Sequence, residues 1–187
     1  MRVVSVNVAL ARAVPWRGGT VTTGIFKEPV RGRRRITAAG LAEDEQADLR
    51  VHGGPQKAVY LYPSEHYAAW RADLGSEDLP WGTFGENVTT EGLSEEVACV
   101  GDRYRVGTAI LEATKPRFPC YKLGIRFGDP GIIPRFLASG RSGFYAAVLE
   151  EGDVGPGDPI ERVPGGPRGP TIADLVRGRI RRDEAGE

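Results

Sequence analysis

The sequence is short of cysteine and histidine, carries no excess of either charge and has no long apolar run. Its 187 residues hold 25 basic and 25 acidic side chains, so the overall field that draws a protein to nucleic acid or to an anionic membrane is absent. No stretch approaches the ~20 apolar residues that cross a bilayer, and two cysteines cannot build a disulfide framework. We therefore expect a cytoplasmic protein that binds neither nucleic acid nor membrane.

The usual zinc motifs are also missing. There is no CxxC and no HExxH, and the two histidines, His52 and His66, fall in different predicted elements. A zinc site of the usual composition is therefore not indicated.

Glycine and proline, by contrast, are abundant. The 26 glycines and 14 prolines fall mostly between short β-branched runs, which favours many turns over long helices. Apolar and polar residues alternate over 4–8, 21–25 and 59–61, as in half-buried strands. The alternation at the amino terminus also differs from the apolar block of a signal peptide.

The rest of the chain continues this pattern of short elements. Short helices are predicted after Ser64, ending at Gly75, and over 120–127 and 133–139. Further strands are predicted at 87–90, 96–100, 103–106, 109–114, 144–149 and 160–163. Strands do not alternate with long helices, which argues against a doubly wound parallel sheet. We expect a mixed α/β, predominantly β fold, in which residues 1–163 form a closed or nearly closed β-barrel with short inserted helices.

The C-terminal part has a different composition. Residues 164–170 read PGGPRGP, which is typical of a linker. Thr171 and Asp174 then resemble a capping box at the start of a helix within 171–187. One apolar stripe of that helix comprises Ile172, Leu175, Val176 and Ile180. The stripe predicts docking on the barrel or on a second subunit, so we expect a monomer or a homodimer.

Cys120 is the residue most indicative of chemistry. Prolines precede it in KPRFPCYKLG, and four cationic side chains stand within six residues of it: Lys115, Arg117, Lys122 and Arg126. Cationic neighbours stabilise a thiolate, which is a nucleophile or a soft metal ligand. The alternative is a cysteine packed as a small hydrophobe, which is how we interpret Cys99 in the alternating run EEVACV.

A glycine turn offers a second candidate site. His52 opens the stretch VHGGPQK, whose glycines would let backbone amides approach an anion, and Lys57 stands just beyond. The alternative is a structural turn with a hydrogen-bonded histidine.

Other polar residues are candidates for the site but also have ordinary structural interpretations. Glu86 and Asn87 lie in FGENVTTEGL, where a carboxylate and an amide can read the edge of a heterocycle, although such residues also make ordinary turns. Lys27 follows a strand in TGIFKEPV and is otherwise a solvated lysine. The basic run RGRRR at 31–35 and the acidic run at 43–45 are interpreted as solvated loops.

Taken in order, these segments resemble a known family. The chain resembles the MOSC domain, the carboxy-terminal domain of molybdenum cofactor sulfurases that also occurs as stand-alone proteins, in four segments: HGGPQKAVYLYPSEHY, GTFGENVTTEGL, GDRYRVGTAILEATKPRFPCYKL and GRSGFYAAVLEEGDVGPGD. The resemblance runs from about Thr22 to Val163 and is strongest to the YiiM-type stand-alone branch. The terminal helix is similar to the start of that branch's helical extension.

The resemblance implies a mostly β-barrel fold that binds the molybdenum pterin cofactor. The metal-coordinating cysteine of the family's PRxPC motif falls on Cys120. The family's TGIxK lysine, HGG histidine and FGEN asparagine, which would line the pocket around the pterin, fall on Lys27, His52 and Asn87. Phosphate partners are implied at Arg117 and Lys122.

The resemblance also implies an activity. Stand-alone relatives reduce small N-hydroxylated bases and related compounds with electrons from a separate flavoprotein reductase, and the absence of a flavin or nicotinamide fingerprint here agrees with an external donor. The hydroxyl oxygen would leave as water after two electrons and two protons, which requires a proton donor. His52, with an unperturbed pKa near ~6.5, and Glu86 are the candidates.

The sequence leaves two other functions open. As a molybdenum cofactor or sulfur carrier, the chain would bear a persulfide on Cys120 and transfer it without turning over a substrate. As a small hydrolase or transferase, it would use Cys120 as a nucleophile and need a neighbouring base, which the sequence does not identify. A molybdenum-dependent oxidoreductase is the leading hypothesis.

Overall fold

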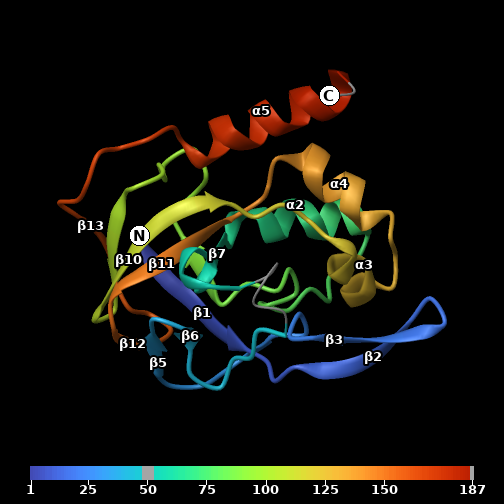
Figure 1. Cartoon of the computed structure of the whole chain (residues 1–187), viewed down its shortest axis with the longest axis horizontal. Coiled ribbons are helices and arrows are strands. Elements are labelled where there is room, and N and C mark those ends of the chain that lie inside the picture. Colours follow the sequence, from blue (N-terminus) through green and yellow to red (C-terminus); the bar gives the residue numbers. More distant parts are fainter. Residues whose placement is uncertain (48–52, 186–187) are drawn as a thin grey trace.

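An eight-stranded sheet organises the chain (Figure 1). The computed structural model describes residues 1–47 and 53–185. In pairing order the strands of the sheet are β13 (Ile160–Val163), β9 (Arg103–Val106), β10 (Ala109–Pro116), β11 (Phe144–Glu150), β7 (Val59–Pro63), β8 (Val88–Glu91), β1 (Arg2–Val8) and β4 (Glu28–Pro29). The pairs are antiparallel except for β7 and β8, which run parallel and are separated in the chain by a helix.

Of the predicted closed or nearly closed barrel, the described residues do not form a closed one. The order of strands begins at β13 and ends at β4, and no ladder within residues 1–47 and 53–185 joins the two. The edge of β1 does approach the segment before β13, through an isolated bridge between Arg2 and Pro159 and a 2.9 Å hydrogen bond from the Ile160 amide to the Met1 carbonyl. Proline has no amide hydrogen to donate to a ladder, and β4 occupies the other half of the edge. The sheet therefore curls toward closure without completing it.

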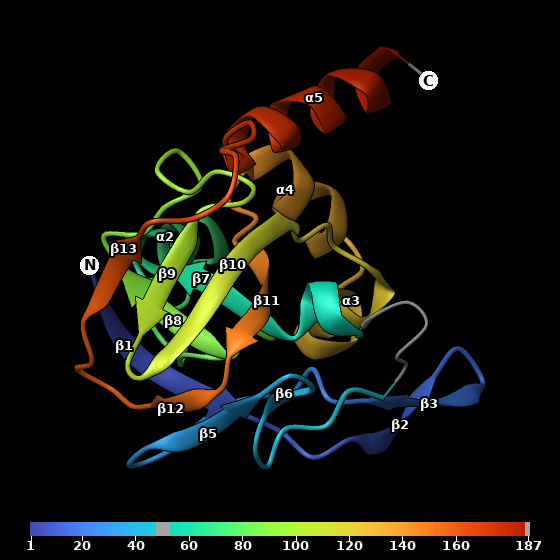
Figure 2. The same ribbon diagram turned by 60° about the vertical axis from the view of Figure 1, so that its left-hand side comes forward.

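Two smaller sheets lie beside the main one (Figures 1 and 2). One joins β12 (Gly152–Val154), β5 (Arg34–Thr37) and β6 (Gly40–Leu41). The other is a hairpin of β2 (Arg12–Trp16) and β3 (Gly19–Thr23) that projects as an arm. The hairpin turn places Arg17 at φ 49° and Gly18 at φ 78°, the left-handed pair that a two-residue hairpin needs.

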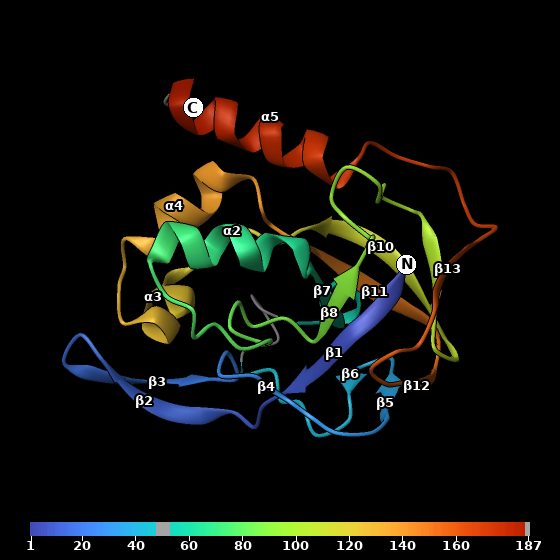
Figure 3. The ribbon, with the colours of Figure 1, turned by 180° about the vertical axis from the view of Figure 1, so that it is seen from behind.

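The helices gather on one side of the sheet (Figure 3). Among the described residues there are four α-helices, α2 (Glu65–Leu74), α3 (Tyr121–Phe127), α4 (Ile132–Ser139) and α5 (Ile172–Ala185), and a short 3-10 helix η1 (Pro55–Lys57). Their positions confirm the predicted helices, and Gly75 ends α2 at φ 62° as expected. A buried aromatic cluster lies beneath α2 and α4, in which the Trp70 indole donates a 2.8 Å hydrogen bond to the Tyr62 hydroxyl. None of the described helices combines the length and the apolar character needed to span a bilayer.

The strand predicted at 96–100 is absent. This segment forms a turn in which the amides of Val97 and Ala98 donate to the Ser94 carbonyl at 3.1 and 2.9 Å. Cys99 makes a single bridge to Thr171, and its amide donates to the Asp102 carboxylate at 3.0 Å. Because these bonds satisfy the backbone locally, the apolar alternation of the segment does not produce a strand.

Helix α5 packs on the sheet domain. The Asp174 amide donates to the Thr171 hydroxyl at 3.0 Å, so the predicted cap is present. Ile172 and Val176 are buried in the main hydrophobic core, whereas Leu175 is only half-buried. Residues 164–170 contain no helix or strand and are mostly exposed, yet the Gly169 amide bonds the Val100 carbonyl at 2.7 Å. The segment interpreted as a linker therefore contacts the sheet domain through its backbone.

Candidate functional site

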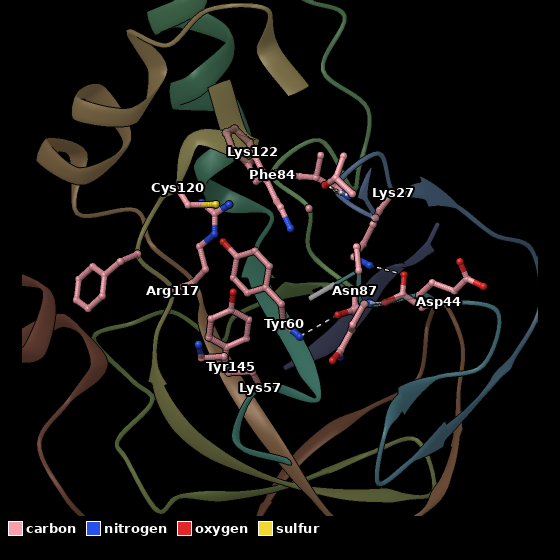
Figure 4. A pocket seen from close by; sticks show the side chains of 18 residues that line it. Lys27, Asp44, Lys57, Tyr60, Phe84, Asn87, Arg117, Cys120, Lys122 and Tyr145 are labelled. Atoms are coloured by element: carbon pink, nitrogen blue, oxygen red, sulfur yellow. Dashed lines mark hydrogen bonds and ion pairs between the residues drawn. The ribbon is translucent and has the colours of Figure 1, made fainter. Parts of the chain in front are cut away.

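A pocket forms where segments distant in the sequence meet (Figure 4). Its open space is about 660 Å³, part of which is continuous with solvent. Five of the predicted site residues line it: Lys27, Asn87, Arg117, Cys120 and Lys122. The sixth predicted binding residue, His52, lies outside the described residues, but Lys57 from the same predicted stretch lines the pocket.

The lining divides into two walls (Figure 4). Arg117, Cys120 and Lys122 come from the end of β10 and the start of α3. Across the pocket stand Lys27 and Asn87 together with Asp44, which the sequence did not single out. The tyrosines of β7 and β11, Tyr60 and Tyr145, lie between the two walls.

Cys120 is held at the residue that precedes α3. Its backbone is extended, with φ −134° and ψ 174°, and its carbonyl accepts a 2.9 Å hydrogen bond from the Leu123 amide in the first turn of the helix. Upstream, the Arg117 amide donates to the Gly143 carbonyl at 3.3 Å. These bonds fix a half-buried thiol on the pocket wall. Cys99, in contrast, is 4% exposed and is not among the residues that line the pocket.

Arg117 is a buried cation with spare hydrogen-bonding capacity. It is 5% exposed, and its guanidinium lies 5.6 Å from the centroid of the Tyr60 ring and 5.0 Å from that of Phe136. Its Nη1 has no hydrogen-bond partner among the described residues. Burial lowers the pKa of this group, but Coulombic interactions, led by that with Tyr60 and including one with Cys120, outweigh burial and leave the pKa raised. The side chain therefore stays charged.

The opposite wall is built around one carboxylate. The Lys27 ammonium forms an ion pair with Asp44 Oδ1, and Asp44 Oδ2 accepts a 2.9 Å hydrogen bond from Asn87 Nδ2. Asn87 Oδ1 in turn accepts the Tyr60 amide at 3.1 Å. Burial lowers the pKa of Lys27, and the attraction of Asp44 opposes this shift. The predicted pocket residues Lys27 and Asn87 thus share a partner that lay in a run interpreted as solvated.

Glu86 is buried outside the pocket lining. Its carboxylate is completely buried and accepts hydrogen bonds from the amides of Gly82 at 2.8 Å and Phe84 at 3.2 Å and from the Thr89 hydroxyl at 3.0 Å. Burial raises the pKa of Glu86 against the effect of these bonds and of one from Tyr67. The residue predicted as a proton donor orders the turn that carries Asn87, and it is not among the residues that line the pocket.

The pocket also contains residues that sequence reasoning missed. Burial raises the pKa of both Tyr60 and Tyr145, so their phenols stay protonated at neutral pH. The chain has only four lysines, and three of them, Lys27, Lys57 and Lys122, line this pocket. The sequence does not predict this concentration of lysines, because the three come together only through tertiary contacts. Among the described residues that line the pocket, these side chains and Arg117 outnumber the carboxylates, which favours an anionic occupant.

Comparisons with known proteins identify the fold and the family. The crystal structure of YiiM from Geobacillus stearothermophilus superposes with a TM-score of 0.79 at 34% identity, over 99% of this chain and 87% of that one. YiiM from Escherichia coli is 38% identical over 143 residues, which is 75% of this chain and 64% of that protein. The chain is also similar to YflK from Bacillus subtilis, with 39% identity over 170 residues, 91% of this chain and 76% of YflK.

A fungal protein provides a further match. A protein of Gibberella moniliformis named "Reductase" is 40% identical over 146 residues, which make up 76% of this chain but only 26% of that protein. The family model of the MOSC domain matches residues 48–161. On this match and the YiiM likeness, which confirm the resemblance noted in the sequence, the chain belongs to the MOSC domain family.

Proposed function

We propose that this chain binds a molybdenum pterin cofactor through Cys120 and reduces small N-hydroxylated compounds with electrons from a separate flavoprotein reductase. The observation that carries the proposal is the placement of a half-buried thiol in one pocket with four cationic side chains: Lys27, Lys57, Arg117 and Lys122. The relative named "Reductase" supports a redox activity.

The residues of the pocket fit such a group. A thiolate is the soft ligand that thiophilic metals prefer. Arg117 Nη1 is a buried donor without a partner among the described residues, and leaving such a donor unsatisfied is costly. A phosphate or another anionic oxygen of the cofactor would satisfy it and neutralise the buried charge.

The proposal gives each side chain a role. Cys120 would hold the metal, Arg117 and Lys122 would hold the phosphate, and Lys27 and Asn87 would form the wall around the pterin. When bound, the cofactor supplies the two-electron reduction of the N–O bond, and the protein supplies orientation and charge. Because the Glu86 carboxylate is bonded to the turn at 82–84 and does not line the pocket, His52 is the proposed proton donor among the two candidates.

The test combines metal analysis with turnover. The protein is produced in a host that synthesises the molybdenum cofactor, its molybdenum is quantified, and an N-hydroxylated base is supplied with a flavoprotein reductase and its reductant. Stoichiometric molybdenum with conversion of the base to its amine supports the proposal. Molybdenum without turnover indicates a carrier, and a preparation without molybdenum contradicts cofactor binding.

A further inference from the structure

Asp44 has almost no contact with water, and both of its carboxylate oxygens are used. Its side chain is 3% exposed. Oδ1 pairs with the Lys27 ammonium and accepts the Ala9 amide at 2.9 Å, while Oδ2 accepts Asn87 Nδ2 at 2.9 Å. The three donors come from separate segments of the chain, so one carboxylate ties together three parts of the pocket wall.

The backbone around Asp44 is fixed as firmly as its side chain. The Glu45 amide donates to the Ala9 carbonyl at 2.8 Å, and the Glu45 carboxylate accepts the Ala11 amide at 2.8 Å. Together with the bond from the Ala9 amide to Asp44, these contacts hold residues 44–45 against the segment that follows β1. The carboxylate is therefore held in place before any occupant enters the pocket.

We propose that Asp44 is a positioning residue of this site: its carboxylate holds the Lys27 ammonium and the Asn87 amide in place on the wall opposite Cys120 (Figure 4). The inference extends the proposed function, since it assigns the group that orients two of the residues assigned to the pterin. Its structural part concerns contacts within this chain and is testable without cofactor.

The charge on Lys27 depends on this contact. Among the described residues, two carboxylates act on the ammonium: Asp44 directly, and Glu86 through a weaker Coulombic attraction. Glu86 is committed to the amides of the turn at 82–84, so Asp44 is the direct counter-ion. Without it, burial alone would favour the neutral amine.

The lysine scarcity of the chain makes a direct test practicable. In protein labelled at lysine Nζ and Cε, the four lysines give few signals, and Lys27→Met identifies the one from Lys27. In the cofactor-free protein, Asp44→Asn should lower the pKa of Lys27 by roughly 1–3 units, because an opposite charge at contact distance has been removed. Titration followed by NMR measures the shift.

Glu43→Gln is the matched control. Glu43 is the neighbouring carboxylate but pairs with Arg34 at 3.1 Å on the surface, so its removal should leave the titration of Lys27 unchanged. An unchanged Lys27 in Asp44→Asn, or an equal shift in Glu43→Gln, would overturn the inference. If Asp44→Asn does not fold, the same measurements are made on the unsubstituted protein. A Lys27 amine that is neutral at pH 7 refutes the proposed contacts. So does an Asn87 side-chain amide whose hydrogens exchange with solvent as fast as those of an exposed amide.

A second arm tests the link to the cofactor. Molybdenum content is compared in the unsubstituted protein, Asp44→Asn, Lys27→Met and the double variant, with thermal melting measured in parallel. Because Asp44 acts through Lys27 as well as through Asn87, the double variant should lose less molybdenum than the sum of the two single losses. Losses that simply add would remove Asp44 from this role. An unsubstituted protein without molybdenum refutes the proposed function, whereas the NMR titration still decides the role of Asp44.

Discussion

The guanidinium of Arg117 lies over the ring of Tyr60, 5.6 Å from its centroid. The phenol of Tyr60 is itself occupied, because its hydroxyl donates to the Ser142 carbonyl at 2.7 Å. The ring face of Tyr60 therefore makes a cation–π contact with Arg117, while its hydroxyl is hydrogen-bonded to the loop before β11. This contact keeps at the pocket an arginine whose Nη1 has no hydrogen-bond partner among the described residues, and a buried donor left unsatisfied in this way costs stability until an anionic ligand binds it.

Arg117→Met should separate binding from stability. An apolar side chain of similar length removes a buried charge, so we expect the melting temperature of the cofactor-free protein to stay the same or rise. Cofactor affinity should fall about 10- to 100-fold, because a charged hydrogen bond worth roughly 1.5–3 kcal/mol is lost. Thermal melting and molybdenum content of the same preparations measure both effects.

The control for this change is Arg135→Met. Arg135 is exposed on α4 and donates to the Asp73 carbonyl at 2.6 Å, outside the residues that line the pocket. Its substitution should leave molybdenum content unchanged. A normal metal content in Arg117→Met would remove Arg117 from the binding set.

Cys120→Ser should abolish molybdenum retention and activity and leave the fold intact. A hydroxyl is a harder and far less readily ionised ligand than a thiol, and a half-buried position tolerates the change. Cys99→Ser provides the comparison, since Cys99 lies in the core and outside the pocket lining. Metal analysis decides between them: retention in Cys120→Ser, or loss in Cys99→Ser, would show that the ligand has been misassigned.

The sequence predicts the regular parts of the fold well. β1 follows a run of alternating apolar residues, and α2 ends at a glycine with a left-handed backbone. These signals are local, so they can be read without the fold. β7 forms where predicted, but all five of its residues are buried, so the expectation of a half-buried strand there is wrong. The arm of β2 and β3 was only half predicted, because β2 contains Pro15 and its turn places Arg17 at a positive φ that arginine rarely adopts.

The site is predicted unevenly for a similar reason. Cys120, Arg117 and Lys122 stand close together in the chain, and their motif identifies them. Asp44 belongs to an acidic run directly after an arginine run, and Arg34 does pair with Glu43 there as a surface loop would. Only the approach of Lys27 and Asn87 distinguishes Asp44 from its neighbours, and that approach depends on tertiary contacts that no local pattern encodes.

Asp102→Ala should destabilise the protein without affecting the pocket. The Asp102 carboxylate is 2% exposed and bonds the Cys99 amide at 3.0 Å and the Tyr104 hydroxyl at 3.2 Å, and it pairs with Arg168 of the segment 164–170 at 3.2 Å. Leaving two buried donors unsatisfied costs roughly 2–4 kcal/mol, which lowers the melting temperature by about 5–15 °C for a chain of this size.

Asp153→Ala is the matched surface control for Asp102→Ala. Its carboxylate is 47% exposed and pairs with Arg35 at 3.7 Å, a contact of little energetic weight. We expect its melting temperature to stay close to that of the unsubstituted protein. Equal melting temperatures for both variants, or loss of molybdenum in Asp102→Ala alone, would contradict this account.

The stability of the protein should also depend on the proton of Glu86. Burial raises the pKa of Glu86 above its ordinary value of 4.5, so the folded state binds the proton more tightly than the unfolded state. The resulting contribution to the free energy of unfolding is fully present below pH 4.5 and is lost as the pH rises through the folded-state pKa. In urea denaturation at a series of pH values, the unsubstituted protein should therefore lose stability relative to Glu86→Gln across this window. If the difference in unfolding free energy between the two proteins stays constant with pH, the pKa of Glu86 is the same in the folded and unfolded states.

Truncation after Val163 should reduce stability and spare the cofactor site. It removes Ile172 and Val176 from the main core, two side chains whose burial is worth roughly 1.5–3 kcal/mol each. None of the proposed binding residues lies beyond Val163, so molybdenum content should be preserved in the protein that remains folded. Melting temperature, sedimentation mass and molybdenum content are the measurements, and a change of the sedimentation mass from that of a dimer to that of a monomer would place the helix at a subunit interface.

A contact between α5 and the pocket lining provides a test of whether the helix supports the cofactor site. Arg179 of α5 lies 5.9 Å from the ring centroid of Phe118, and Phe118 lines the pocket beside Arg117 and Cys120. Arg179→Ala removes this contact and keeps the apolar stripe of the helix, so it should change neither melting temperature nor metal content. If Arg179→Ala loses molybdenum while its stability and mass stay unchanged, the helix supports the pocket through Phe118, and its buried stripe serves to place Arg179.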